Sequence, residues 1–161
     1  MKRSVLAAVL VMLTMSLSLH AQEKLNLKPW AGTWIYNFDK STHDEESANK
    51  MKRVFELYGT TGMKFTRDAT SAHGEPQHSV YIVKTFDGTE YKAEGSTTGG
   101  GVSYRQIDDH TLECISKSPN GNVMKQVLVL AKDGNSFVLT ESGQYGNGKI
   151  ADHYSYFERQ K

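Results

Sequence analysis

Residues 121–142 read GNVMKQVLVLAKDGNSFVLTES and contain two apolar runs on either side of a turn signal. Val127–Leu130 and Phe137–Leu139 are rich in the aliphatic, β-branched and aromatic residues that strands favour. Asp133-Gly134 lies between them and is typical of a tight turn, because glycine adopts a positive φ at low cost. The stretch therefore predicts two antiparallel strands joined by a two-residue hairpin.

Similar turn signals recur about every 12 residues from Gly74 to Gly148, which leaves room for strands but none for a crossover helix. They are His73-Gly74, Asp87-Gly88, Gly99-Gly100-Gly101, Asp108-Asp109, Asn120-Gly121, Asp133-Gly134 and Asn147-Gly148. About ten strands are expected, at 32–39, 51–58, 62–69, 77–86, 89–96, 101–108, 111–117, 122–132, 135–143 and 151–159. An open sheet of that size would have two long edges and an uncovered apolar face. We therefore predict an all-β fold, an antiparallel up-and-down meander closed into a barrel of about 8–10 strands.

One segment, residues 41–50, interrupts the strand pattern with polar residues. Thr42 and Glu45 have the spacing of a capping box, which favours a short helix. The segment has almost no apolar stripe, which favours a solvated connection between the first two strands.

The composition indicates one folded domain. The chain has 161 residues, of which 38% are hydrophobic and 23% charged, enough for a core and too little charge for a disordered chain. Its formal charge is +1, which provides no basic surface for a polyanion. Nucleic acid is therefore not an expected partner.

Residues 1–21 have the three-part layout of a secretory signal. Lys2 and Arg3 precede the apolar run Val5–Leu13, and a cleavage site is expected after Ala21. The run is shorter than the roughly 20 apolar residues that a membrane anchor needs. We expect a cleaved signal peptide at 1–21, a barrel domain at 22–161, no membrane span after cleavage, and a periplasmic or secreted location.

The single cysteine, Cys114, allows no internal disulfide. It lies in the strand-like run Thr111–Ile115, where cysteine commonly behaves as a small buried hydrophobe. We expect an inert thiol.

The first and last expected strands carry a family resemblance. Gly32-Thr33-Trp34 opens the first strand, and the last ends in a basic residue, Arg159. A Gly-x-Trp on the first strand of a meander resembles the calycin superfamily, which includes lipocalins and fatty-acid-binding proteins. With Lys40-Ser41 and the late Asp-Gly hairpin, the chain is similar to a group of small exported lipocalin-like bacterial proteins. The resemblance implies that Gly32, Trp34 and Arg159 are structural, with Arg159 over the Trp34 ring.

The last strand departs from fatty-acid-binding proteins. Ser155 and Phe157 stand where those proteins carry an Arg-x-Tyr pair for the ligand carboxylate. We therefore do not transfer fatty-acid binding, and the resemblance implies only ligand binding in the broadest sense.

Strand alternation suggests an interior ligand site. The side chains expected on the inner face are Tyr36, Phe38, Phe55, Met63, Phe65, Tyr104, Phe137 and Leu139. Arg67 shares a face with Met63 and Phe65, and a charge inside a barrel needs a partner, so Arg67 is the candidate contact for an acidic ligand. Tyr36, Tyr104 and Gln106 are its candidate hydrogen-bonding neighbours. The competing and more common case is a bulge or twist that turns Arg67 to solvent.

The sequence shows no convergent catalytic or metal-binding set. The histidines at 43, 73, 78, 110 and 153 lie mostly in or beside turns, without the spacing that metal sites use. His73 and His78 are expected to be a surface pair that binds nothing, and no nucleophile elbow occurs. We expect no metal, no cofactor and no enzymatic activity.

Three functions remain open. The first is a barrel that binds a small hydrophobic or amphipathic ligand. The alternative is a filled barrel that acts as an interaction or envelope-stress module without a small-molecule ligand. An enzyme of the kind found among scattered calycins is disfavoured. The sequence predicts neither the ligand nor the oligomeric state.

Overall fold

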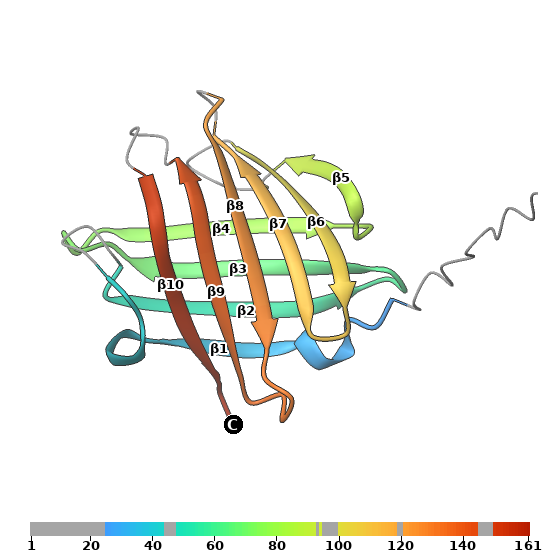
Figure 1. The fold of residues 1–161 in the computed structure, drawn as a ribbon, viewed down its shortest axis with the longest axis horizontal. Helices are drawn as coiled ribbons and strands as arrows, with labels where there is room; N and C mark the ends of the chain where they lie inside the picture. The colour runs from blue at the N-terminus through green and yellow to red at the C-terminus, as the bar shows by residue number, and fades with distance from the viewer. Residues whose placement is uncertain (1–24, 44–47, 93, 95–99, 119–120, 145–149) are drawn as a thin grey trace, which may run out of the picture.

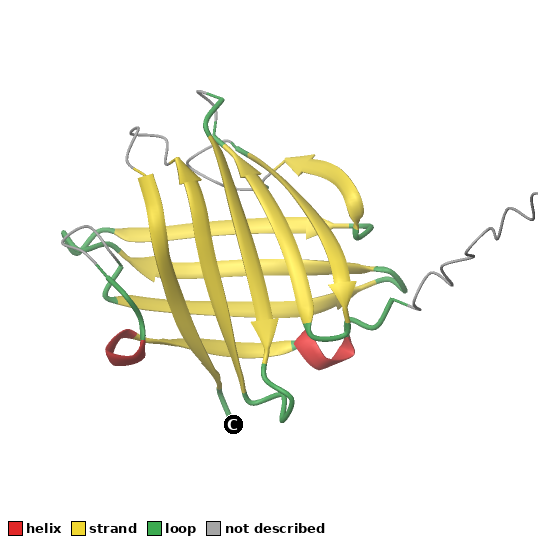
Figure 2. Ribbon diagram, viewed as in Figure 1, coloured by secondary structure: helices red, strands yellow, loops and turns green. Residues whose placement is uncertain are grey.

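A computed structural model of the chain describes residues 25–43, 48–92, 94, 100–118, 121–144 and 150–161. Within them, ten strands form one antiparallel sheet, and the only helices are two short 3-10 turns (Figures 1 and 2). The elements are η1 Lys28–Trp30, β1 Gly32–Asn37, η2 Phe38–Lys40, β2 Lys50–Tyr58, β3 Gly62–Thr70, β4 Pro76–Val83, β5 Asp87–Lys92, β6 Gly101–Asp108, β7 Thr111–Lys117, β8 Val123–Leu130, β9 Ser136–Gln144 and β10 Ile150–Arg159.

The sheet curls into a nearly closed barrel. Its strand order is β4-β3-β2-β1-β10-β9-β8-β7-β6-β5, so the first and last strands pair and every other neighbour is consecutive in the chain. The two edge strands approach each other where the Glu94 N–H donates to the Val80 carbonyl at 2.8 Å. Figure 1 shows β1–β4 running across β6–β10, so the two halves form facing walls. The all-β barrel prediction is confirmed.

The predicted strands match the observed ones within a few residues except around β4 and β5. β4 ends at Val83, and Phe86, predicted to lie in that strand, turns its ring into the core with 7% exposed. Asp87-Gly88 was predicted to be a hairpin turn, and this was wrong. Both residues begin β5, where Gly88 has a φ of +91° and the pairing with β6 shifts register between Asp87 and Glu90. A glycine with a positive φ occurs in bulges as well as in turns, so an Asp-Gly pair does not by itself distinguish a bulge from a turn.

The hairpins around Gly74, Gly121 and Gly134 share one geometry. Each of these glycines has a positive φ and donates its N–H to the carbonyl three residues earlier, at 2.9–3.0 Å. The glycine is therefore the last residue of a four-residue turn, and Asp133 does not have a positive φ. The predicted positive φ is confirmed at Gly121 and Gly134, but the predicted two-residue length was wrong. A tight turn followed by a left-handed glycine closes longer hairpins with the same strand twist.

One end of the barrel interior is filled with apolar side chains. The largest side chains with less than 2% exposed are Trp30, Trp34, Phe55, Phe137, Phe157, Met63, Leu112, Leu128, Leu139, Val83 and Cys114. Phe137 lies at their centre, with its ring centroid 5.0 Å from that of Trp34 and 4.6 Å from that of Phe157. We call this packed region the closed end.

Trp34 is held by contacts that agree with the Gly-x-Trp resemblance. Its indole N–H donates to the Trp30 carbonyl at 3.0 Å, and the Arg159 guanidinium lies 4.1 Å from the centroid of its ring. Gly32 has a φ of +149°, and a Cβ there would lie 2.4 Å from an Arg159 nitrogen. The glycine of the motif therefore leaves space for the arginine, whose guanidinium lies over the Trp34 ring.

Several predictions lie outside the described residues. These are the signal peptide at 1–21, Glu45 of the proposed capping box, Gly99 and Asn120 of two predicted turns, and the Asn147-Gly148 turn. Thr42 is described, and its hydroxyl oxygen accepts the Tyr154 N–H of β10 at 2.8 Å. Within the described part of the chain, no helix has the length and hydropathy needed to cross a membrane.

Candidate functional site

Beyond the closed end, six inward-facing side chains are polar, and buried apolar residues such as Ala69 and Met124 share their faces. The six polar residues are Arg53, Arg67, Ser79, Gln126, Glu141 and His153, which we call the polar end. Each alternates with outward residues and shares its face with buried neighbours on the same strand. Unlike the closed end, all six keep part of their surface exposed, so solvent reaches the interior from this side.

A row of directly paired residues crosses five strands on one wall. The cross-strand partners run from His153 through Glu141, Gln126 and Cys114 to Tyr104. Gln126 Nε2 donates to Glu141 Oε1 at 2.5 Å, and His153 Nε2 lies 3.0 Å from Glu141 Oε2. The Glu141 carboxylate is thus held between two neighbours in the wall.

Glu141 is an ionised carboxylate inside the barrel. Its side chain is 13% exposed. Burial acts to raise its pKa, but the hydrogen bond from His153, the charge of Arg53 and the hydrogen bond from Gln126 outweigh burial and lower the pKa below its ordinary value. The wall formed by β8, β9 and β10 therefore presents a fixed negative charge to the interior at neutral pH.

Arg53 projects into the interior from the opposite wall, on β2. Its guanidinium carbon lies 5.3 Å from the centroid of the buried Phe157 ring on β10. Its positive charge counteracts the rise that burial causes in the pKa of Cys114 and helps to lower the pKa of Glu141. Its Nε–H is buried and has no acceptor in the described part of the chain. Buried donors are nearly always paired, and among the described residues this Nε–H shares its unpaired state with Trp30 Nε1 and His110 Nδ1.

Arg67 lies directly opposite Arg53 on β3. The β2–β3 pairing runs from Lys50 to Tyr58 without a register shift, so no bulge interrupts the strand at Arg67, and the contact of its side chain with Gln77 is exposed. Its Nη1 donates to Gln77 Oε1 at 3.1 Å. Two arginines side by side repel each other, which makes an anion between or beside them favourable.

The apolar residues predicted to line a ligand site lie mainly in packed contacts with one another. The Phe65 and Tyr104 rings stack at 4.5 Å, and Phe55 stacks on Phe137 at 5.8 Å. The remaining ones, Tyr36, Phe38, Met63 and Leu139, belong to the same core or pack against it. Their role in ligand binding stays a prediction.

Gln106 was predicted to be a neighbour of Arg67, and its hydrogen bonds go elsewhere. Its Oε1 accepts the Asn26 N–H at 3.2 Å, and its Nε2 donates to the Asp108 carbonyl at 3.1 Å. It fixes the segment before β1 and is not joined to Arg67 by a described hydrogen bond.

Sequence analysis did not single out Arg53, Gln126, Glu141 and His153. His153 was grouped with histidines near turns, although its alternation with the buried Phe157 on β10 was a usable signal. Pairing it with Glu141 required the β9–β10 register, which local sequence does not show.

The other residues considered for catalysis or metal binding form no such site in the described part of the chain. Cys114 is buried, and burial raises the pKa of its thiol to about 12, as expected for an inert cysteine. His78 contacts Asp68 at 2.6 Å on the outer face, whereas His73 is exposed in a turn. Among the described residues, no three His, Cys, Asp or Glu side chains are grouped to hold a metal ion.

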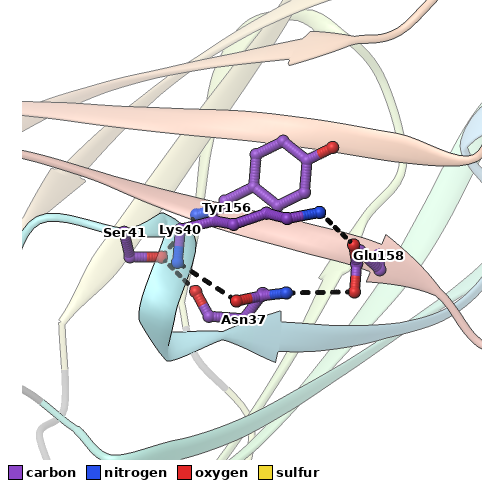
Figure 3. A network of polar contacts seen from close by, with 5 residues as sticks. All are labelled: Asn37, Lys40, Ser41, Tyr156 and Glu158. Atoms are coloured by element: carbon purple, nitrogen blue, oxygen red, sulfur yellow. Dashed lines mark hydrogen bonds and ion pairs between the residues drawn. The ribbon is translucent and has the colours of Figure 1, made fainter.

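The Lys40-Ser41 pair forms a clamp between the end of β1 and β10 (Figure 3). Ser41 Oγ donates to the Asn37 carbonyl at 2.7 Å and accepts the Tyr156 N–H at 2.9 Å. Lys40 Nζ donates to Glu158 Oε1 at 2.8 Å, and the Asn37 amide donates to the other carboxylate oxygen at 3.2 Å. The pair named in the family resemblance is therefore structural and fixes the chain where it leaves β1.

Comparisons with known proteins support the barrel and no narrower family. No protein-family model matches the chain, and no curated protein matches it significantly. A mutant of the fluorescent protein UnaG matches with a TM-score of 0.56 and 12% identity, over 84% of this chain and 99% of that one. A redesigned β-barrel matches with a TM-score of 0.53 and 12% identity, over 85% and 96%. Another, mFAP1 bound to DFHBI, has a TM-score of 0.49 and 10% identity, over 84% and 99%.

The two matches with TM-scores above 0.5 show the class of fold. The chain is a single antiparallel β-barrel, which agrees with the calycin-like architecture expected from the sequence. The similarity to small exported bacterial proteins stays a prediction.

Proposed function

We propose that the protein binds a small amphipathic ligand in the barrel, with the anionic group of the ligand at Arg53 and Arg67. The apolar part of the ligand lies toward the aromatic side chains of the closed end. The binding energy comes from apolar burial, and the guanidinium groups fix the orientation.

Arg53 carries the proposal. A buried N–H without a hydrogen-bond acceptor, such as that of Arg53 Nε, is costly, and the cation–π contact with Phe157 offsets only part of that cost. A carboxylate or similar anion supplies charge-assisted hydrogen bonds to such a group. Arg67 adds a second donor on the neighbouring strand.

The proposal includes export. Residues 1–21 act as a signal peptide, and residues 22–161 are the mature barrel in the periplasm or outside the cell. The mass of the protein recovered from a periplasmic or culture fraction tests this. A mass that retains residues 1–21 there would contradict cleavage.

Binding is tested by titrating a fluorescent fatty acid, used as a probe, against the wild type, Arg53→Met and Arg67→Met. Methionine keeps an apolar stem and removes the charge. We expect at least tenfold weaker binding by Arg53→Met, about 1.4 kcal/mol. The matched control is Arg105→Met, because Arg105 is exposed on the outer face of β6. Equal affinity of Arg53→Met and the wild type would eliminate Arg53 as the anchor.

The alternative is a filled barrel that acts as an interaction or envelope-stress module. The packed closed end favours it, since side chains there occupy the interior themselves. Absence of probe binding by the wild type would support this function instead. Neither function involves a catalytic step.

A further inference from the structure

The barrel wall has a seam between β4 and β5, the two edge strands of the sheet. Among the described residues, the bridge between Val80 and Glu94 is the only backbone pairing across this seam. Every other pair of neighbouring strands forms a ladder of at least four residue pairs. Figure 1 shows β5 curving away from β4 after the short connection that joins them. Side chains, rather than backbone hydrogen bonds, therefore close the wall along the seam.

Tyr91 is one of the side chains that close the seam. It is the only residue of β5 that is not exposed, and it pairs with the buried Val102 of β6, so its ring points inward and packs against the core. Phe86, in the connection between β4 and β5, lies behind it in the interior. The Phe86 ring centroid is 6.2 Å from that of Phe65 and 5.7 Å from that of Tyr104. An opening at the seam therefore leads to the aromatic side chains of the barrel.

The Tyr91 hydroxyl is held by Thr85, which precedes Phe86 in the connection. It accepts the Thr85 N–H at 3.1 Å and lies 2.8 Å from Thr85 Oγ1. The Thr85 hydroxyl donates its single hydrogen to Asp87 Oδ1 at 2.9 Å, so Tyr91 is the donor in the contact between the two hydroxyls. The Tyr91 hydroxyl thus acts as donor and acceptor at once, and these two hydrogen bonds fix the side chain across the seam.

We infer that Tyr91 is a gate in the barrel wall: its side chain rotates outward when the two hydrogen bonds to Thr85 break, and the ligand then passes between β4 and β5. The rotation breaks no backbone pairing across the seam. The route suits an amphipathic molecule, because its apolar part reaches Phe65 and Tyr104 without passing the charged side chains of the polar end. The passage of a ligand rests on the proposed function, whereas the opening itself does not.

Cys114 reports the opening without any ligand, because it is buried and pairs directly with Tyr104, whose ring lies beside that of Phe86. Tyr91→Phe keeps the ring and removes both hydrogen bonds. Tyr58→Phe is the matched control, since Tyr58 is 44% exposed at the end of β2. In long incubations with iodoacetamide, we expect Cys114 to be labelled at least about threefold faster in Tyr91→Phe than in the wild type, and at an unchanged rate in Tyr58→Phe.

Low concentrations of urea separate the gate from global unfolding. Labelling through a side-chain rotation exposes little surface and should not accelerate with urea, whereas labelling through global unfolding should. An unchanged labelling rate in Tyr91→Phe, or acceleration by urea from the lowest concentration, would overturn the gate.

Stopped-flow mixing with the fluorescent fatty acid tests whether the ligand uses this route. We expect the association and dissociation rate constants each to rise at least about threefold in Tyr91→Phe while the affinity stays within about twofold, because a gate alters the barrier and not the bound state. Unchanged rate constants despite faster labelling of Cys114 would overturn the route. Absence of probe binding by the wild type would overturn the proposed function and the passage of a ligand, and the labelling of Cys114 would still decide whether Tyr91 opens the wall.

Discussion

The guanidinium of Arg159, at the end of the last strand, lies 4.1 Å from the ring centroid of Trp34 on the first strand. The same group donates to the Ala31 carbonyl at 2.6 Å and to the Gly134 carbonyl at 2.7 Å. One side chain thus joins β10, the segment before β1 and the β8–β9 hairpin. This contact closes the barrel at its packed end.

Trp34→Ala is expected to destabilise the protein by about 3–5 kcal/mol, because it removes a fully buried indole from a packed core. Urea unfolding measures the change. Ile35→Ala is the matched control, since Ile35 follows on the same strand and is 39% exposed. A loss below about 1 kcal/mol in Trp34→Ala would show that the ring does not support the core.

Gly134→Val is expected to lower the melting temperature, as is Gly121→Val. The φ of Gly134 is +69°, and no atom lies within 4 Å of a Cβ built there, so the cost comes from the backbone conformation, about 1–2 kcal/mol. Gly134→Asn is the control, because asparagine adopts this conformation more readily. Equal melting temperatures for Gly134→Val and the wild type would contradict the assignment.

Much of the fold was predictable because its signals are local. Runs such as Val127–Leu130 and the glycines of the turns report strand positions without knowledge of partners. The Asp87-Gly88 error arose because a bulge and a turn place the same demand on φ.

The candidate site was less predictable because it depends on pairing across the barrel. Arg53 and Glu141 lie on different walls, and their electrostatic interaction follows from closure of the sheet. Arg67 was identified because alternation with Met63 and Phe65 is visible in one strand. Arg53 alternates with Phe55 in the same way, but the unpaired state of its Nε–H is a property of the folded chain.

Ser41→Ala is expected to destabilise the protein by about 1–3 kcal/mol, because it leaves the Tyr156 N–H without its acceptor in a partly buried position. Lys40→Met is the comparison within the same clamp. The Lys40–Glu158 ion pair is exposed, so its removal is expected to change stability little and less at high salt. Urea unfolding at two salt concentrations measures the stability of both variants. Equal losses of stability in Ser41→Ala and Lys40→Met would contradict the expected difference between them.

Native Cys114 is expected to resist alkylation at pH 8. Burial raises the pKa of its thiol to about 12, so little thiolate forms, and reagents do not reach it. Mass spectrometry after iodoacetamide treatment measures the modified fraction. The urea-unfolded protein is the control and should be modified fully; rapid labelling of the folded protein would show that Cys114 is accessible.

Glu141 is expected to make stability depend on pH in the acid range. Its folded-state pKa is lowered below the ordinary 4.5, so its stabilising contribution is present above pH 4.5 and is lost as the pH falls through the folded-state value. The stability difference between the wild type and Glu141→Gln should therefore be constant near neutral pH and shrink below about pH 4.5. Urea unfolding at a series of pH values measures it, with Glu113→Gln as the control, because Glu113 faces outward on β7 and pairs with Lys125 at 2.6 Å. A difference that grows on acidification would mean that Glu141 is protonated in the folded barrel at neutral pH.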